Sequence, residues 1–339
     1  MSAISQASSS LRRRPYFLLS AAVVVVAAVA WGVNSQMSLQ DVRAKNAAVS
    51  LAGRRAVVVG GTSGIGHGIA VRLAKANASV TIVGRDASRG AAIVDEMKAT
   101  GGSGSHRFVP CDAFLLDNVR KTAETIRADT PALDILVLSQ GIGTMQGRTE
   151  TSEGIDQKLA LHYYGRMGFV GSLLPSLRAQ AAAEPAFAPR VLTILTAGVH
   201  PPYAHYRSDP EVKTHYSLKN AADAGCMYND LAVDSLSRDP SNKGIAFIHS
   251  APGMVDTNII RGLPTVVQWI AGLLRPLSRS IHDSAEYLLG PVLGGGVKGG
   301  FLLKGSEGQD VPVTALHEEA REFVWAHTKG VLGRHGIGI

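Results

Sequence analysis

Short runs of β-branched and other apolar residues alternate with helix-length segments along most of this 339-residue chain. The runs predict strands over residues 56–59, 80–83, 106–109, 133–138, 191–195, 245–249 and 301–303. Helices are expected between them, among others over residues 116–128, 155–180 and 219–237. Strands separated by helices pair in parallel, and helices then cover both faces of their sheet. The sequence therefore predicts an α/β fold built on a doubly wound parallel sheet.

Composition and hydropathy divide the chain into segments. We expect a cytosolic or targeting N-terminus (1–15), a transmembrane anchor (16–34), a linker (35–50), the α/β domain (51–310) and a C-terminal helix and tail (311–339). With 45 % hydrophobic and 18 % charged residues, the chain has ample material for a core, which excludes intrinsic disorder. Its two cysteines, Cys111 and Cys226, are too few for a disulfide framework or a cysteine metal site, and no metal is expected.

The formal net charge of +7 is concentrated at the N-terminus. Residues 1–55 hold seven of the 34 Lys and Arg residues but only one of the 27 Asp and Glu residues. The rest of the chain is nearly neutral, whereas a nucleic-acid-binding domain carries a basic face. A nucleic-acid partner is therefore not expected.

Residues 16–33 (YFLLSAAVVVVAAVAWGV) are mostly apolar and lie within an uncharged stretch from Pro15 to Gln40. A helix of this length spans roughly 27 Å, close to the thickness of the endoplasmic reticulum bilayer. Arg12, Arg13 and Arg14 precede it, which places the N-terminus in the cytosol. We expect a single-pass protein of the endoplasmic reticulum membrane, anchored in the bilayer by residues 16–33. A cleaved secretory signal and a mitochondrial presequence are alternatives for the same residues.

A glycine-rich turn, GGTSGIG at residues 60–66, lies between the first predicted strand and a helix. Glycines let the backbone approach a pyrophosphate closely, and the amino end of a helix offers free N–H groups to it. This placement between strand and helix makes the turn a strong indication of a dinucleotide site.

The turn resembles that of the short-chain dehydrogenase/reductase family, with glycines at Gly60, Gly64 and Gly66. The resemblance covers residues 53–305 and implies a divergent, membrane-anchored member with a Rossmann fold. It extends to Asp112 after the third strand, to Gly141 after the fourth, and to PGMVDT at residues 252–257. It implies cofactor contacts at Gly60, Thr62, Ser63, Gly64, Ile65, Gly66, Arg85, Asp112, Gly141, Lys219, Pro252, Gly253, Val255 and Thr257.

The end of the second strand indicates which cofactor binds. An acid there holds the ribose of NAD, whereas an arginine accommodates the 2′-phosphate of NADP. This chain has Gly84 at that position, followed by Arg85. A guanidinium binds phosphate in bidentate fashion, so NADP(H) is the expected cofactor.

The resemblance implies a catalytic tyrosine with a lysine four residues later, but the sequence departs from this spacing. Tyr216 is followed by Lys219 at the third position and by Asn220 at the fourth. We expect Tyr216 to be the acid/base and Lys219 to assist it; alternatively, Lys219 keeps the usual register and His215 replaces the tyrosine.

Two further positions of the family pattern are altered. Thr196 follows the fifth strand where the family has a serine that hydrogen-bonds the substrate carbonyl, and its hydroxyl can do the same. His162 lies where the family has an asparagine that takes part in proton relay. It either relays a proton itself or is a hydrogen-bonded core residue.

The sequence therefore predicts an NADP(H)-dependent dehydrogenase or reductase acting on the carbonyl or alcohol of a lipophilic small molecule such as a steroid, retinoid, terpenoid or polyketide. The apolar segment 264–277 suits such a substrate or a membrane surface. A homodimer is a further expectation. The altered catalytic positions leave one alternative, a weakly active or inactive NADP(H)-binding sensor or scaffold at a membrane.

Overall fold

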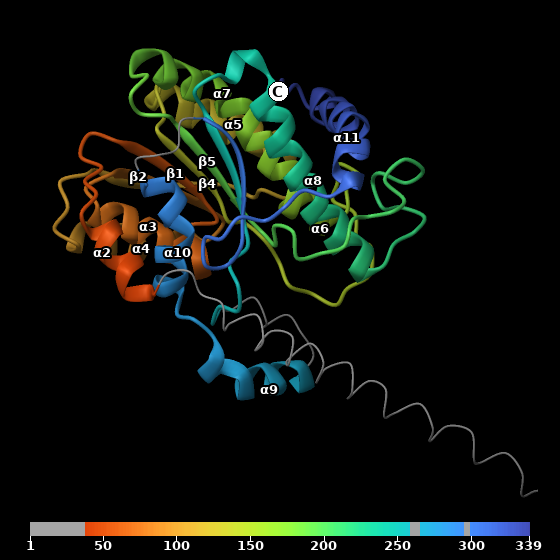
Figure 1. The fold of residues 1–339 in the computed structure, drawn as a ribbon, viewed down its shortest axis with the longest axis horizontal. Helices are drawn as coiled ribbons and strands as arrows, with labels where there is room; N and C mark the ends of the chain where they lie inside the picture. The colour runs from red at the N-terminus through yellow and green to blue at the C-terminus, as the bar shows by residue number, and fades with distance from the viewer. Residues whose placement is uncertain (1–37, 258–264, 295–298) are drawn as a thin grey trace, which may run out of the picture. The chain divides into compact units, whose positions relative to one another are not determined.

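The computed structural model describes residues 38–257, 265–294 and 299–339. Seven parallel strands form one sheet in the order β3-β2-β1-β4-β5-β6-β7, shown in Figure 1. The strands are β1 (Arg55–Val59), β2 (Ser79–Gly84), β3 (His106–Pro110), β4 (Ile135–Leu138), β5 (Arg190–Ile194), β6 (Ala246–Ser250) and β7 (Gly300–Lys304). The predicted doubly wound parallel sheet is confirmed.

Helices cover both faces of the sheet because successive strand residues point to opposite sides. Val57 and Val59 face one core, together with residues of α5 (Leu116–Asp129), α7 (Gly165–Ala183), α8 (Leu218–Arg238) and α11 (Ala315–Arg334). Ala56 and Val58 face the other, with α3 (Gly64–Lys75), α4 (Ala87–Ala99) and α10 (Ile281–Leu293). Figure 1 shows these two helical layers on either side of the strands.

The compact unit extends beyond the predicted limits 51–310 at both ends. It runs from Leu39 to Ile339. Helix α2 (Leu39–Ala47) occupies the expected linker and packs on α10, where the Asn46 side chain donates hydrogen bonds to the backbone and carboxylate of Glu286. Helix α11 packs through Val324, Val331 and Leu332 into the core shared with α8.

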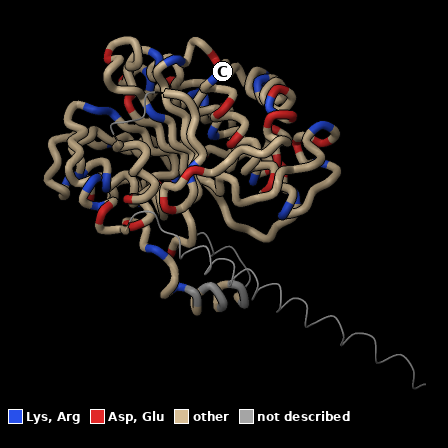
Figure 2. Tube along the Cα trace, in the orientation of Figure 1, with Lys and Arg blue, Asp and Glu red and all other residues tan. Residues whose placement is uncertain are grey.

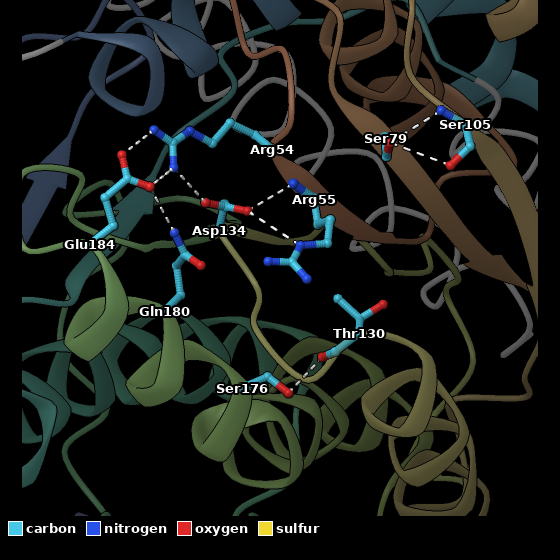
Figure 3. Close-up of polar contacts among 9 residues, drawn as sticks. All are labelled: Arg54, Arg55, Ser79, Ser105, Thr130, Asp134, Ser176, Gln180 and Glu184. Carbon is cyan, nitrogen blue, oxygen red and sulfur yellow. Dashed lines mark hydrogen bonds and ion pairs between the residues drawn. The ribbon is translucent and has the colours of Figure 1, made fainter.

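A polar network ties together the amino ends of β1 and β4 (Figure 3). The buried Asp134 accepts hydrogen bonds from the Arg55 backbone N–H at 2.8 Å and from the Arg54 guanidinium at 3.2 Å. Arg54 also forms an ion pair with Glu184, just after α7. These contacts lie opposite the carboxyl ends of the strands, so that edge remains available for a ligand.

The order of the strands reverses at β1, which lies between β2 and β4. Val59 at the end of β1 pairs with Val83 and with Leu138, so the loops after these three strands begin side by side. In open α/β sheets a ligand binds at this switch point. The charged residues of the described chain are of mixed sign along the trace (Figure 2).

The predicted anchor at residues 16–34 lies outside the described residues. Within the part of the chain that the structure describes, no helix combines the length and apolar character needed to span a bilayer.

Candidate active site

The glycine-rich turn packs so closely that side chains cannot be accommodated at two of its positions. A Cβ at Gly60 would lie 2.6 Å from the backbone N of Gln140, and Gly60 has a φ of +80°. A Cβ at Gly66 would lie 2.3 Å from the carbonyl oxygen of Gly60. The turn therefore brings the first residues of α3 against the end of β1 and the loop after β4.

The amino end of α3 is suited to a phosphate. The helix begins at Gly64, its first turn has no acidic residue, and among the described contacts the Ser63 side chain does not cap it. Thr257 lies against this end, because a Cβ at Gly64 would be 3.5 Å from its methyl carbon. A cavity of about 510 Å³ lies here, lined by Thr62, Ser63, Gly64, His67, Arg89, Ala92, Ile93, Glu96, Asp256, Thr257, Arg275 and Ile281. These residues fit the pyrophosphate of a dinucleotide.

The remaining predicted cofactor residues lie in loops at the same edge of the sheet. Asp112 follows β3, and its carboxylate accepts a hydrogen bond from the Phe114 backbone N–H at 3.2 Å. Gly141 follows β4 and lies against His162, whose Nε2 would be 3.1 Å from a Cβ at this position. Pro252, Gly253 and Val255 follow β6, whereas Ile65 is the second residue of α3 and packs partly buried against the core.

At the end of β2, Gly84 packs directly against the glycine-rich turn. A Cβ there would lie 2.5 Å from the hydroxyl oxygen of Thr62, so an acidic side chain could not occupy this position without displacing Thr62. The next residue, Arg85, is exposed, and its guanidinium lies 5.2 Å from the centre of the Phe114 ring. Stacking on an aromatic ring orients a guanidinium while leaving its N–H groups free to bind a ligand.

The Tyr216 phenol lies beside a lysine, but this lysine is Lys158. The Lys158 ammonium donates hydrogen bonds to the Tyr216 hydroxyl oxygen at 3.2 Å and to the Gln146 carbonyl at 2.9 Å. Lys158 belongs to α6 (Gln157–Leu159) and is only 7 % exposed. Burial raises the pKa of Tyr216 to about 12 and lowers the pKa of Lys158, because burial disfavours the charged form of each group.

Lys219 points elsewhere. Its ammonium forms an ion pair with Asp223 one turn along α8, and its side chain is 68 % exposed. Asn220, at the fourth position after Tyr216, donates a hydrogen bond to the His215 carbonyl at 2.7 Å. The His215 ring stacks on His205 and lies 3.3 Å from a carboxylate oxygen of Asp209. The described contacts therefore bring neither Lys219 nor the His215 ring to the Tyr216 hydroxyl.

His162 lies in a five-residue π-helix, η1 (Ala160–Tyr164), between α6 and α7. Its Nε2 accepts a hydrogen bond from the Ile142 backbone N–H at 3.0 Å. Burial, with the nearby charges of Arg166 and Lys158, lowers its pKa to about 3, so the ring is neutral at physiological pH. These contacts favour the hydrogen-bonded alternative, in which His162 fixes the loop after β4.

Thr196, in the loop after β5, contacts α8. Its hydroxyl oxygen lies 2.7 Å from the sulfur of Cys226. Burial raises the pKa of Cys226 to about 12, so the thiol stays protonated and can donate a hydrogen bond to the Thr196 hydroxyl oxygen. The Thr196 hydroxyl hydrogen is then available for a ligand.

Comparison with known proteins shows the family to which the chain belongs. Residues 54–184 match the short chain dehydrogenase family. An oxidoreductase from Emericella nidulans is 34 % identical over 259 residues, which cover 74 % of this chain and 75 % of the relative. The chain belongs to the short-chain dehydrogenase/reductase family, and it is an oxidoreductase of this type.

Two other similar proteins extend the comparison. A polyprenol dehydrogenase from Mus musculus is 28 % identical over 296 residues, covering 84 % of this chain and 85 % of the relative. The solved RhlG/NADP active-site complex of Pseudomonas aeruginosa is 22 % identical, with a TM-score of 0.54 over 76 % of this chain and 96 % of that one. This structural likeness shows that the fold is shared.

Two residues of the candidate site in this short-chain dehydrogenase, Lys158 and Cys226, are not predicted by the sequence motifs. Neither fits the family motifs, and each partner is distant in sequence, 58 residues from Lys158 to Tyr216 and 30 residues from Thr196 to Cys226. One signal was available for Lys158, a lysine within the mostly apolar stretch that leads to His162.

Proposed function

We propose that this chain is an NADP(H)-dependent oxidoreductase that interconverts a carbonyl group and an alcohol on a lipophilic small molecule. One observation carries the proposal: His162 links the dinucleotide-binding loop to the helix that follows Tyr216. The His162 ring accepts a hydrogen bond from the backbone N–H of Ile142, the residue after Gly141. The Cβ of His162 lies close to α8, since a Cβ added at Gly225 would be 3.6 Å from it. This connection between the loop after β4 and the helix that follows Tyr216 supports a single site for the proposed proton donor and cofactor.

The chemistry follows from the groups at this edge. A bound nicotinamide cofactor supplies or accepts the hydride. In the direction of reduction, the Tyr216 phenol gives its proton to the substrate oxygen, and the Thr196 hydroxyl donates a hydrogen bond to the same oxygen. The raised pKa of Tyr216 keeps the phenol protonated before the reaction, as a general acid must be.

NADP(H) is proposed as the cofactor because of Gly84 and Arg85. The close packing of Thr62 against Gly84 excludes the acid that would hold the ribose of NAD, and Arg85 offers an exposed, ring-stacked guanidinium to a 2′-phosphate. The Pseudomonas structure is likewise described as an NADP complex.

NADPH should bind at least about tenfold more tightly than NADH, a difference of about 1.4 kcal/mol. Arg85→Ala should remove most of this difference by weakening NADPH alone, because only NADPH carries the 2′-phosphate. Nicotinamide fluorescence titration of both cofactors measures it, and Arg120→Ala, which removes a partly exposed arginine paired with Glu124 in α5, is the matched control. Equal dissociation constants for the two cofactors in the unmutated protein would refute the assignment.

A lipophilic substrate is proposed from an exposed apolar surface on α9 and the residues that follow it. Trp269 and Leu273, in α9 (Thr265–Leu274), and Leu277 recur every four residues and are 69 %, 63 % and 64 % exposed. Exposed apolar side chains at helical spacing form a surface for an apolar ligand or a membrane. The mouse relative is named for polyprenol, a lipophilic alcohol.

The function can be tested by NADPH oxidation with a panel of hydrophobic ketones, including steroid, retinoid and isoprenoid carbonyls. Turnover of at least one compound, lost in Tyr216→Phe, supports the oxidoreductase. Cofactor binding without turnover by any compound would support the second candidate, a cofactor-binding sensor or scaffold, which the position of Asn220 and the exposure of Lys219 favour.

We also propose that residues 16–33 anchor the protein in the endoplasmic reticulum membrane. The protein should remain in the pellet after alkaline carbonate washing, and deletion of residues 1–35 should release it with its NADPH affinity intact. Eighteen mainly apolar residues favour insertion, since Leu, Ile, Phe and Val contribute about 0.3–0.6 kcal/mol each. A soluble mature chain starting near residues 31–35, found by mass spectrometry, would instead show a cleaved targeting peptide.

A further inference from the structure

Lys158 is a buried lysine in a site where the family motif would place a different lysine. Its side chain reaches the Tyr216 hydroxyl at 3.2 Å, whereas Lys219 is paired with Asp223. Burying an ammonium costs free energy unless hydrogen bonds and an opposite charge compensate for the lost hydration. The position of Lys158 therefore calls for a functional explanation.

The backbone around Lys158 is held in place by Asp156. One carboxylate oxygen of Asp156 accepts from the backbone N–H groups of Lys158 and Leu159 at 3.0 and 3.3 Å, and the other accepts from Thr149 at 3.1 Å. Gln157 accepts a hydrogen bond from the Gln146 side chain at 2.9 Å. The Gln146 carbonyl, which accepts a hydrogen bond from the Lys158 ammonium, is thus fixed relative to α6. The lysine side chain is thereby directed at the Tyr216 phenol.

We infer that Lys158, rather than Lys219, is the lysine that stabilises the tyrosinate form of Tyr216 during catalysis. This inference rests on the proposed oxidoreductase function. When Tyr216 gives its proton to the substrate oxygen, the O–H bond breaks and its electron pair stays on the phenolate oxygen. An ammonium 3.2 Å away stabilises this negative charge, and a proton from solvent restores the phenol after product release.

Two other charged groups, Arg148 and Asp156, act on the ionisation of Tyr216 or Lys158. Arg148 lowers the pKa of Tyr216 and Asp156 raises it, while Asp156 raises the pKa of Lys158. Arg148 is paired with Glu150, and Asp156 is occupied by three backbone N–H groups. By contrast, the Lys158 ammonium is hydrogen-bonded to the phenol oxygen itself. Among the described residues, two acceptors bind two of its three N–H groups, which leaves one N–H donor for a ligand.

Lys158→Met tests the inference in the full-length protein. It should lower kcat for ketone reduction at least about 100-fold while changing the NADPH dissociation constant less than about threefold. Lys219→Met is the matched control and should stay within about threefold of the unmutated kcat. Lys158→Arg keeps the charge and should recover part of the lost activity. Equal activity of Lys158→Met and the unmutated enzyme, or a loss confined to Lys219→Met, would overturn the inference.

A titration that needs no turnover separates this inference from the proposed function. Lysine ε-carbons labelled with ¹³C report ionisation by NMR, with the Lys158 signal assigned from Lys158→Met and folding checked by circular dichroism at each pH. Tyr216→Phe should lower the pKa of Lys158 by at least about half a unit, because the buried ammonium loses a hydrogen-bond acceptor that stabilises its charged form. An unchanged pKa of Lys158 refutes the pairing even if the enzyme is active. A lowered pKa of Lys158 in a protein without turnover upholds the pairing and refutes the oxidoreductase.

Discussion

Replacing Tyr216 with phenylalanine should lower kcat for ketone reduction by at least about 1,000-fold and leave the NADPH dissociation constant within about twofold. The change removes one hydroxyl, which is the proposed proton donor, and general acid catalysis contributes about 10²–10⁴-fold. The phenylalanine ring keeps the packing of Tyr216 against the core. Steady-state kinetics and fluorescence titration on the same preparation provide the two measurements.

Two control variants make this result specific. Tyr206→Phe removes a phenol that donates to Glu319 of α11 at 2.8 Å, and it should leave kcat unchanged. His215→Ala tests the alternative register in which the histidine is the acid/base. Full activity of Tyr216→Phe together with an inactive His215→Ala would show that the alternative register is correct.

Gly66→Ala should weaken NADPH binding at least about 100-fold, or about 2.7 kcal/mol. The added Cβ would lie 2.3 Å from the Gly60 carbonyl oxygen, so the turn must open where the pyrophosphate is expected to bind. Gly330→Ala is the control, because nothing lies within 4 Å of its Cβ position in α11 and alanine favours a helix.

The folding of the glycine variant must be measured beside its binding. Urea unfolding followed by circular dichroism reports whether Gly66→Ala is folded. Gly64→Ala is a milder second variant, since its Cβ would be 3.5 Å from Thr257 although its φ of +55° strains an alanine. NADPH affinity unchanged in both folded variants would mean that the dinucleotide does not bind at this turn.

The strands could be predicted to within two residues because most of them are short runs of buried, largely apolar residues. The two edge strands, β3 and β7, are less buried. Helix α2 could not, since its sequence is polar and its partner Glu286 lies 240 residues from Asn46. The continuous helix expected over 155–180 contains a π-helical turn at η1. A single π-helical turn has no hydrophobic periodicity that distinguishes it from the α-helix around it, so the sequence pattern does not predict it.

The glycine motif and the residues after the strands predict the candidate cofactor loops because their chemistry is local. The lysine assignment depended on the point at which a helix begins. Ser217 caps α8 by accepting from the Asn220 backbone N–H, so Lys219 is the second helical residue and meets Asp223 at i+4. Motif spacing alone does not predict the residue at which α8 begins. It also does not predict how residues 146–157 fold to bring Lys158 to the Tyr216 phenol.

The packing of Gly84 against Thr62 also restricts how cofactor preference could change during evolution. A gain of NAD preference would require an acid at position 84, yet the first atom of that side chain would collide with the Thr62 hydroxyl at 2.5 Å. A smaller residue at position 62 would relieve this contact, whereas a lineage that acquired the acid alone would pass through an ancestor with a displaced Thr62 side chain in the glycine-rich turn. Sterics therefore link the two positions, and a change of the proposed NADP(H) preference would involve both.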